Sequence, residues 1–392
     1  MNRRASACVV IVLALLTTGA AAGQQPDTLP PERPFVPGGV YDKPYLTNLL
    51  GRTALGGYAE AHARYERVDG VTEELGFDAK RFNLFTATRV SDFVRIGAEL
   101  EIEEGGEELK LEYAAIDVLL HPALAVRGGM ILAPLGRFNL AHDSPRNEFT
   151  DRPLVSTEIL GVALSEAGLG VLGLLPAGGS ARITYELYAV NGFGDALLLE
   201  AEGGTRLPLG RQGFGDTNRS PAFVGRLAAS PRTGWELGVS AHHGAYNVFE
   251  QDGLQMDDRR DLTIAVLDLE LEGAGVRVHG EAARAWIDLP PSLGGLFADA
   301  QSGFYIEAAA TFGRGWVGAM PASTFAWKAR VDAVDFDRGR RGDSVEQLSV
   351  GLNFRPTSDT ALKLDYVRGR SFDPFNNRAD HASVLFSLAT YF

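Results

Sequence analysis

The sequence predicts an all-β protein, a 16-stranded antiparallel transmembrane β-barrel with short periplasmic turns and long extracellular loops. Three observations predict it. Apolar and polar residues alternate along many short segments, and the connections between these segments alternate between short and long. No run of 18 apolar residues follows the first 22 residues, so a membrane-spanning helix is excluded and only a closed barrel could cross a bilayer.

The N-terminus has the order of regions found in a secretory signal peptide, with two arginines, an apolar stretch and three alanines at 3–4, 7–16 and 20–22. We expect residues 1–22 to be a cleaved signal peptide, 23–50 a Pro-rich irregular lead, and 51–392 the outer-membrane barrel. Cys8 is the only cysteine and lies in the signal peptide. The exported chain therefore has to fold without disulfide bonds.

The charge of the chain argues against nucleic acid as a partner. The formal net charge is −13, and it becomes −15 when Arg3 and Arg4 leave with the signal peptide. A surface this acidic repels phosphate backbones.

Sixteen segments have the length and alternation of strands, at 55–67, 80–90, 92–102, 110–121, 123–132, 158–171, 180–191, 221–230, 235–244, 261–272, 275–287, 303–312, 323–336, 346–355, 360–370 and 382–392. In 92–102, for example, Val94 and Ile96 share the face predicted to meet lipid, while Arg95 and Glu99 share the inner face. The last segment ends on Phe392, which suits an aromatic girdle at the membrane surface.

The connections support a barrel more strongly than the strands do. Short ones fall at 91, 121–122, 230–234, 273–275 and 356–359, and long ones at 68–79, 133–157, 192–220, 245–260, 288–302 and 371–381. Outer-membrane barrels sort their loops in this way, with tight turns in the periplasm. A soluble β-sandwich has no reason to do so, and both chain ends are expected on the periplasmic side.

Charged residues at inward positions are expected to line a water-filled lumen. The cations are Arg64, Arg95, Arg182, Arg277, Lys328, Arg330 and Lys363, and the acids are Glu60, Glu99, Glu101, Glu186, Asp268, Glu270, Glu281, Asp332 and Asp365. Because the two signs nearly balance, the lining leaves ion selectivity open.

The connection at 133–157 mixes apolar and charged residues, and long structured loops are usually functional. If it folds inward, it forms the pore constriction through Arg137, His142, Asp143, Arg146, Glu148, Asp151 and Arg152. The alternative is a cap over the barrel mouth.

An acidic turn carries Glu103, Glu104, Glu107 and Glu108 on the side expected to face outward. Carboxylates could bridge to lipopolysaccharide through calcium or magnesium ions. A solvated charged loop is the other interpretation.

Several short motifs resemble the phosphate-selective porin O/P family: Gly56-Gly57-Tyr58-Ala59-Glu60-Ala61-His62, the segment 78–101, Pro134-Leu135-Gly136-Arg137-Phe138-Asn139, Thr150-Asp151-Arg152-Pro153-Leu154-Val155 and Leu352-Asn353-Phe354-Arg355-Pro356. The resemblance implies a sixteen-stranded, typically trimeric outer-membrane channel. In the best-known members an arginine ladder and a lysine cluster select phosphate and polyphosphate.

The residues and the resemblance together predict an outer-membrane porin for passive diffusion of small hydrophilic solutes or ions, with anions such as phosphate among them. We expect no catalytic residues, cofactor or metal, and contacts with membrane lipid and lipopolysaccharide in a homotrimer. One alternative is an outer-membrane barrel hydrolase, although no G-x-S-x-G or H-E-x-x-H pattern occurs. Another is a structural or adhesive barrel with a blocked lumen.

Overall fold

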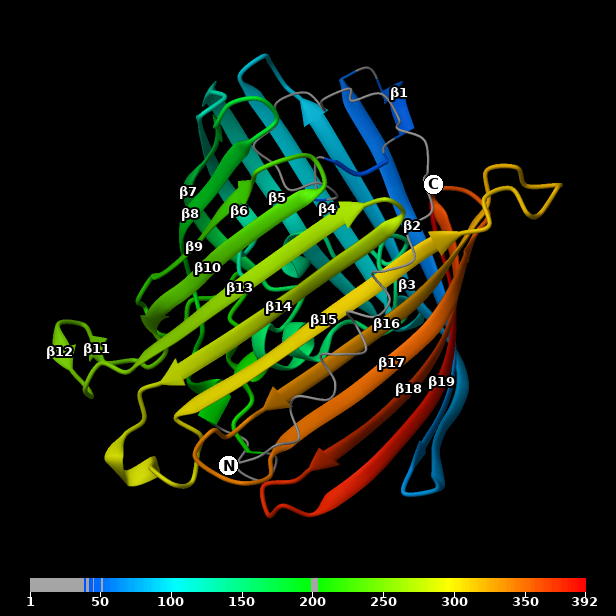
Figure 1. Ribbon diagram of the computed structural model, residues 1–392. Helices are drawn as coiled ribbons and strands as arrows, with labels where there is room; N and C mark the ends of the chain where they lie inside the picture. Colours follow the sequence, from blue (N-terminus) through cyan, green and yellow to red (C-terminus); the bar gives the residue numbers. More distant parts are fainter. Residues whose placement is uncertain (1–38, 40–41, 45, 51, 199–203) are drawn as a thin grey trace.

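A computed structural model describes residues 39, 42–44, 46–50, 52–198 and 204–392; the predicted signal peptide lies outside this part. Within it, sixteen antiparallel strands form a closed barrel (Figure 1). They are β2 (Thr53–Val68), β3 (Val71–Arg89), β4 (Val94–Glu103), β5 (Glu108–His121), β6 (Leu124–Leu132), β7 (Ser165–Pro176), β8 (Arg182–Val190), β9 (Ala222–Ser230), β10 (Trp235–Ala245), β13 (Asp261–Gly273), β14 (Val276–Ile287), β15 (Ala300–Phe312), β16 (Thr324–Asp335), β17 (Ser344–Arg355), β18 (Thr360–Phe372) and β19 (Arg378–Tyr391).

The barrel closes where β19 pairs with β2, in a register that runs from His381 opposite Val68 to Tyr391 opposite Tyr58. Phe392 extends this seam, because its backbone exchanges two hydrogen bonds with Gly57 (3.0 and 3.2 Å). Closure satisfies the backbone groups that an open sheet would leave at its edges. The predicted fold class is confirmed.

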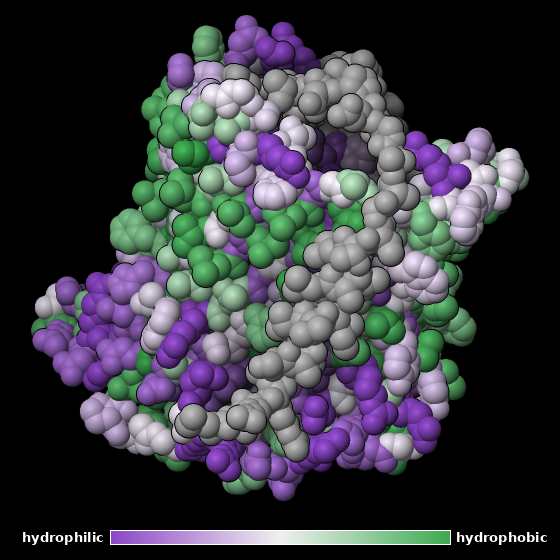
Figure 2. All heavy atoms as spheres, in the orientation of Figure 1, coloured by the Kyte–Doolittle hydropathy of each residue, from purple (hydrophilic) through white to green (hydrophobic). Residues whose placement is uncertain are grey.

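Side chains alternate between the lumen and the outer surface along each strand, because the side-chain period of a strand is two. On β17, Leu348 and Val350 point outward and are 49% and 41% exposed, whereas Ser349 between them is buried. On β18, Lys363 and Asp365 are buried inside the barrel. In Figure 2 hydrophobic residues gather around the middle of the visible face and hydrophilic residues gather toward its ends.

The long loops lie together at one end of the barrel, where the connections between β2 and β3 and between β4 and β5 are short, and mostly short turns lie at the other end (Figure 1). One long loop carries the short strands β11 (Glu250–Gln251) and β12 (Leu254–Gln255). The connection at 313–323 is the exception at the short-turn end, where it projects sideways from β15 and β16.

The predicted long loop at 68–79 is wrong. β2 and β3 form a tall hairpin in which only Asp69 and Gly70 make the turn. Their φ angles of 49° and 84° suit a two-residue turn of the kind that Asp-Gly favours in hairpins. The polar residues that suggested a loop, among them Glu73 and Glu74, belong to β3.

The lead predicted as irregular also contains a strand. β1 (Leu46–Leu50) pairs antiparallel with β2, with Leu46 opposite Leu55 and Leu50 opposite Thr53. The segment just ahead of the barrel is therefore tied to its first strand.

The helical segments are short: η2 (Glu104–Gly106), η3 (Phe138–Leu140), η4 (Ser156–Leu160), η5 (Asp195–Leu198), η6 (Leu207–Gly210) and η7 (Pro291–Leu293). In the described ranges no helix is long and apolar enough to cross a membrane.

The hydrophobic core lies inside the barrel. Inward side chains of β8, β9 and β13, such as Tyr188, Val224 and Ile264, pack in one cluster with Leu135 and Ile159 from the connection between β6 and β7. Burying this much apolar surface stabilises the connection in the lumen.

Candidate pore constriction

The connection between β6 and β7, residues 133–164, is called loop 3 below. It lies inside the barrel, where Phe149, Val155 and Ile159 are at most 2% exposed. It is longer than the predicted 133–157, because η4 occupies 156–160 and β7 begins only at Ser165. The strand predicted at 158–171 therefore started too early: its first apolar residues pack into the lumen core instead of the wall.

Backbone N–H groups of loop 3 donate hydrogen bonds to side chains of the barrel wall. Gly136 N donates to Ser240 Oγ (2.8 Å) and Phe138 N to Glu281 Oε1 (2.6 Å). Two further wall carboxylates accept in the same way: Asp365 from Thr150 N (2.8 Å) and Asp332 from Leu154 N (3.0 Å). These four donors have wall acceptors, while other N–H groups of loop 3, such as those of Leu140 and Arg146, donate within the loop.

Cations of the wall hold the carbonyl groups of loop 3. The donor and acceptor pairs are Lys328 with Glu148 O (2.5 Å), Arg330 with Asp151 O (2.9 Å), Lys363 with Ser144 O (2.7 Å) and Arg355 with Pro145 O (2.7 Å). Lys328 also pairs with Asp365, and Arg330 with Asp332. Lys328, Arg330 and Lys363 were predicted to line the lumen and do face inward, but loop 3 covers them.

Glu148 joins loop 3 to three wall residues. Its carboxylate lies 3.4 Å from both Arg277 and Arg355 and accepts a hydrogen bond from Asn353 (2.7 Å). Burial alone would raise the pKa of Glu148, but Arg355, Arg277 and Lys328 lower it to about 2.

His142 and Asp143 lie against the opposite wall. His142 contacts Asn139 O through Nδ1 (2.9 Å) and Glu112 Oε1 through Nε2 (2.8 Å). Burial, followed by the charge of Arg152, lowers the pKa of His142 to about 4. His142 thus connects loop 3 to Glu112 of β5 and acts as a structural group.

The remaining predicted constriction residues lie apart from one another. Asp151 pairs with Arg64 of β2 (2.5 Å), and Arg152 donates to Val162 O (3.2 Å). Arg137 and Arg146 face a cavity between loop 3 and the wall.

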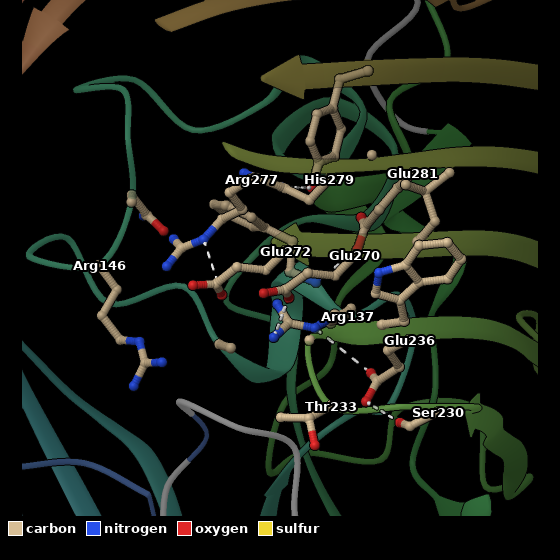
Figure 3. A pocket seen from close by; sticks show the side chains of 18 of the residues that line it. Arg137, Arg146, Ser230, Thr233, Glu236, Glu270, Glu272, Arg277, His279 and Glu281 are labelled. Carbon is tan, nitrogen blue, oxygen red and sulfur yellow. Dashed lines mark hydrogen bonds and ion pairs between the residues drawn. The ribbon is translucent and has the colours of Figure 1, made fainter. Parts of the chain in front are cut away.

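This cavity has a volume of about 430 Å³ and lies near the short-turn end of β9, β10, β13 and β14. Figure 3 shows Arg137 pointing toward Glu236 and Glu270, while Arg146 extends into the open space. Arg137 forms ion pairs with Glu236 and Glu270, and its Nε lies 3.6 Å from Glu236 Oε1. Arg182, Arg277 and Glu281 of the predicted lumen set also line it, with Trp235, Glu272, His279 and Tyr305.

Several predicted lumen residues lie elsewhere. Glu60 and Glu101 both pair with Arg81 of β3. Arg95 is half-buried on the inner face of β4. Glu186 accepts a hydrogen bond from Tyr188 Oη (2.6 Å) and lies 3.6 Å from Arg127.

Sequence reasoning missed several inward arginines. Arg226 binds Asp268 (2.5 Å) and Glu236 (2.8 Å), and Arg127 binds Asp117 through two hydrogen bonds (2.7 and 2.9 Å). The alternation of β9 could have found Arg226, which shares a face with Val224 and Ala228. In the part of the chain that the structure describes, no group of three or more His, Cys, Asp or Glu side chains could hold a metal ion.

Comparison with known proteins finds one distant relative by sequence. The chain is 27% identical over 360 residues to an uncharacterized protein of Aquifex aeolicus. The match covers 84% of this chain and 79% of that protein. No family model matches the chain.

Solved structures share the fold at low sequence identity. OmpF of Salmonella typhi superposes with a TM-score of 0.55 at 11% identity, covering 87% of this chain and 98% of OmpF. The outer-membrane channel DcaP of Acinetobacter baumannii superposes with a TM-score of 0.52 at 13% identity, covering 87% of this chain and 97% of DcaP. OmpT, an outer-membrane protein of Vibrio cholerae, superposes with a TM-score of 0.53 at 10% identity, covering 89% of this chain and 100% of OmpT. The chain thus has the closed 16-stranded barrel fold of outer-membrane porins.

Proposed function

We propose that this protein is an outer-membrane channel for the passive diffusion of small hydrophilic solutes. The observation that carries the proposal is the open, charged cavity of about 430 Å³ between loop 3 and the barrel wall. The apolar outer surface and the charged inner residues that line this cavity support a barrel that crosses lipid and holds water. Diffusion through it needs no cofactor.

In this proposal the short turns face the periplasm and the long loops face outside, as in other bacterial barrels. The signal peptide predicted at 1–22 would direct export. One solved neighbour is a trimer form of OmpT, which supports a homotrimer here. Lipid and lipopolysaccharide would surround the outer face.

A blocked structural barrel is the second candidate, because the lumen contains the apolar cluster around Leu135 and Ile159. Single-channel recording of the protein in planar bilayers separates the two candidates. A folded protein that never conducts would refute the channel and favour the structural barrel.

The charges of the cavity favour a weak preference for anions. Its carboxylates are occupied: Glu236 and Glu270 pair with arginines, Glu272 lies 3.8 Å from Arg277, and Glu281 accepts from loop 3. Arg146 and Arg182 have no ion pair with any residue that the structure describes. Phosphate selectivity is not part of the proposal, since Lys328, Arg330 and Lys363 are committed to loop 3.

Replacing both free arginines (R146Q/R182Q) should shift the reversal potential in a salt gradient toward cation preference, because it removes two positive charges from the aqueous path. The double variant R67Q/R314Q is the matched control, because Arg67 is exposed on β2 and Arg314 is exposed in the connection at 313–323, which projects sideways from the barrel. It should leave the reversal potential unchanged. Equal reversal potentials in R146Q/R182Q and wild type would show that these arginines do not face the conducting path.

A further inference from the structure

Lys43 is a buried cation that lies ahead of the barrel in sequence and inside it in space. Its side chain is 3% exposed, and Nζ contacts Glu99 of β4 and Asp143 of loop 3, the latter at 2.9 Å. The same ammonium lies 4.8 Å from the centre of the Phe85 ring. These contacts place a residue of the lead between the wall and the constriction loop.

Asp143 also connects to the closing strand of the barrel. Its second carboxylate oxygen accepts a hydrogen bond from Tyr391 Oη (2.9 Å). The Tyr391 ring packs edge-on against Tyr58 and Phe85, with centroids 6.0 and 6.3 Å apart. The lead, loop 3 and the seam of the barrel therefore meet at one point.

The ammonium of Lys43 compensates an otherwise repulsive group of acids. Glu99 and Asp143 share it, and Glu112 lies close enough to act on both. The other charged or titratable groups that face this point are Tyr58, Arg81, His142, Arg146, Arg152 and Tyr391. Burial alone would lower the pKa of Lys43, but Asp143, Glu99 and Glu112 raise it on balance, so the ammonium stays charged.

Removing one member of a buried ion pair leaves the other charge without compensation, which is costly in a dry site. Without Lys43, the carboxylates of Glu99 and Asp143 would repel each other across the gap between wall and loop. Loop 3 can relieve this repulsion in two ways, by moving away from β4 or by taking up a proton.

We propose that Lys43 is a positioning residue. It precedes the barrel strands in the sequence, holds loop 3 against β4 and so sets the width of the pore. The pairing of β1 with β2 fixes the segment that carries Lys43. The expected effect on conductance rests on the proposed channel function. The positioning of loop 3 by Lys43 does not depend on that function.

The test compares K43M with K43R in single-channel recordings between pH 5 and 8. K43M removes the charge at nearly constant volume, so we expect larger current fluctuations and a conductance that changes with pH as one of the two acids binds a proton. K43R keeps the charge and should give the flat pH profile of wild type. The double variant K43M/E99Q removes one acid as well and should restore that flat profile.

Amide hydrogen exchange provides a readout that does not depend on conduction. The N–H groups of Arg146 and Asn147 donate to Asp143 O (3.0 and 3.1 Å) and should exchange faster in folded K43M than in K43R or K43M/E99Q, because loop 3 moves more when it is released from the wall. Equal exchange rates and equal pH profiles in folded K43M and wild type would overturn the inference. A silent wild-type channel with fast exchange in K43M would refute the channel function and leave the positioning role intact.

Discussion

Replacing loop 3, residues 133–164, by a short Gly-Ser turn is expected to raise single-channel conductance several-fold and to admit larger solutes. The barrel should stay assembled, because Leu132 and Ser165 face each other directly at the ends of β6 and β7 and a tight turn can join them. A sixteen-stranded barrel without an internal loop leaves a wide aqueous channel. Planar-bilayer recording and liposome swelling with sugars of increasing size measure both effects.

The matched control shortens the loop that carries β11 and β12, which lies away from the barrel wall (Figure 1). Its conductance should equal that of wild type. Unchanged conductance in the folded loop 3 variant would mean that another segment narrows the pore. The connection at 192–220 would then be the next candidate, since Phe193, Leu197 and Leu207 belong to the lumen core.

If removal of all of loop 3 destabilises the barrel, a smaller deletion between Arg137 and Arg146 tests the same point. It leaves the apolar contacts of Val155 and Ile159 in place. We expect a smaller rise in conductance in the same direction.

The strands could be predicted because their signal is local. A period of two needs only neighbouring residues, and it correctly placed Leu348 and Val350 outside and Lys363 inside. The same rule failed where a strand was polar on both faces: Glu73 and Glu74 look like loop residues, yet they continue β3 beyond the height of β4.

The roles of the inward charges could not be predicted, because their partners are distant in sequence. Lys328 and Arg330 were placed on the inner face from alternation alone. Their acceptors, the carbonyls of Glu148 and Asp151, lie 180 and 179 residues away, and no local pattern relates them. Lys43 is a stronger case, since nothing in the Pro-rich lead indicates that one lysine enters the lumen.

The loop and the wall exchange both kinds of hydrogen bond, which explains the near balance of inward charges. Wall carboxylates such as Asp332 and Asp365 accept from loop 3 amides, while wall cations donate to loop 3 carbonyls. A balanced lining is therefore what the wall needs in order to bind both the remaining amide groups and the remaining carbonyl groups of an irregular segment. In the proposed channel, ion selectivity then depends on the few charged side chains that do not bind loop 3.

Glu148→Gln is expected to lower the free energy of unfolding by roughly 3 kcal/mol, the usual cost of breaking a buried ion pair on one side. Glutamine can still accept from Asn353, but Arg277 and Arg355 lose their counter-charge inside the barrel. Urea unfolding followed by circular dichroism measures the loss. The matched control is Glu346→Gln, because Glu346 pairs with Arg370 with both side chains about half exposed, so that change should cost less than about 1 kcal/mol.

The pH dependence of unfolding distinguishes a charge effect from a change of shape. Surrounding cations hold the pKa of Glu148 at about 2 in the folded protein, below its usual value of 4.5. The unfolded chain therefore binds a proton first as the solution is acidified. The stabilisation is fully present above pH 4.5 and is lost as the pH falls through 2. Glu148→Gln should remove this part of the pH dependence, so its unfolding free energy should approach that of wild type at low pH. A constant difference between the two proteins from pH 6 to 2 would instead mean that the carboxylate acts through its shape, and that the arginines find other partners.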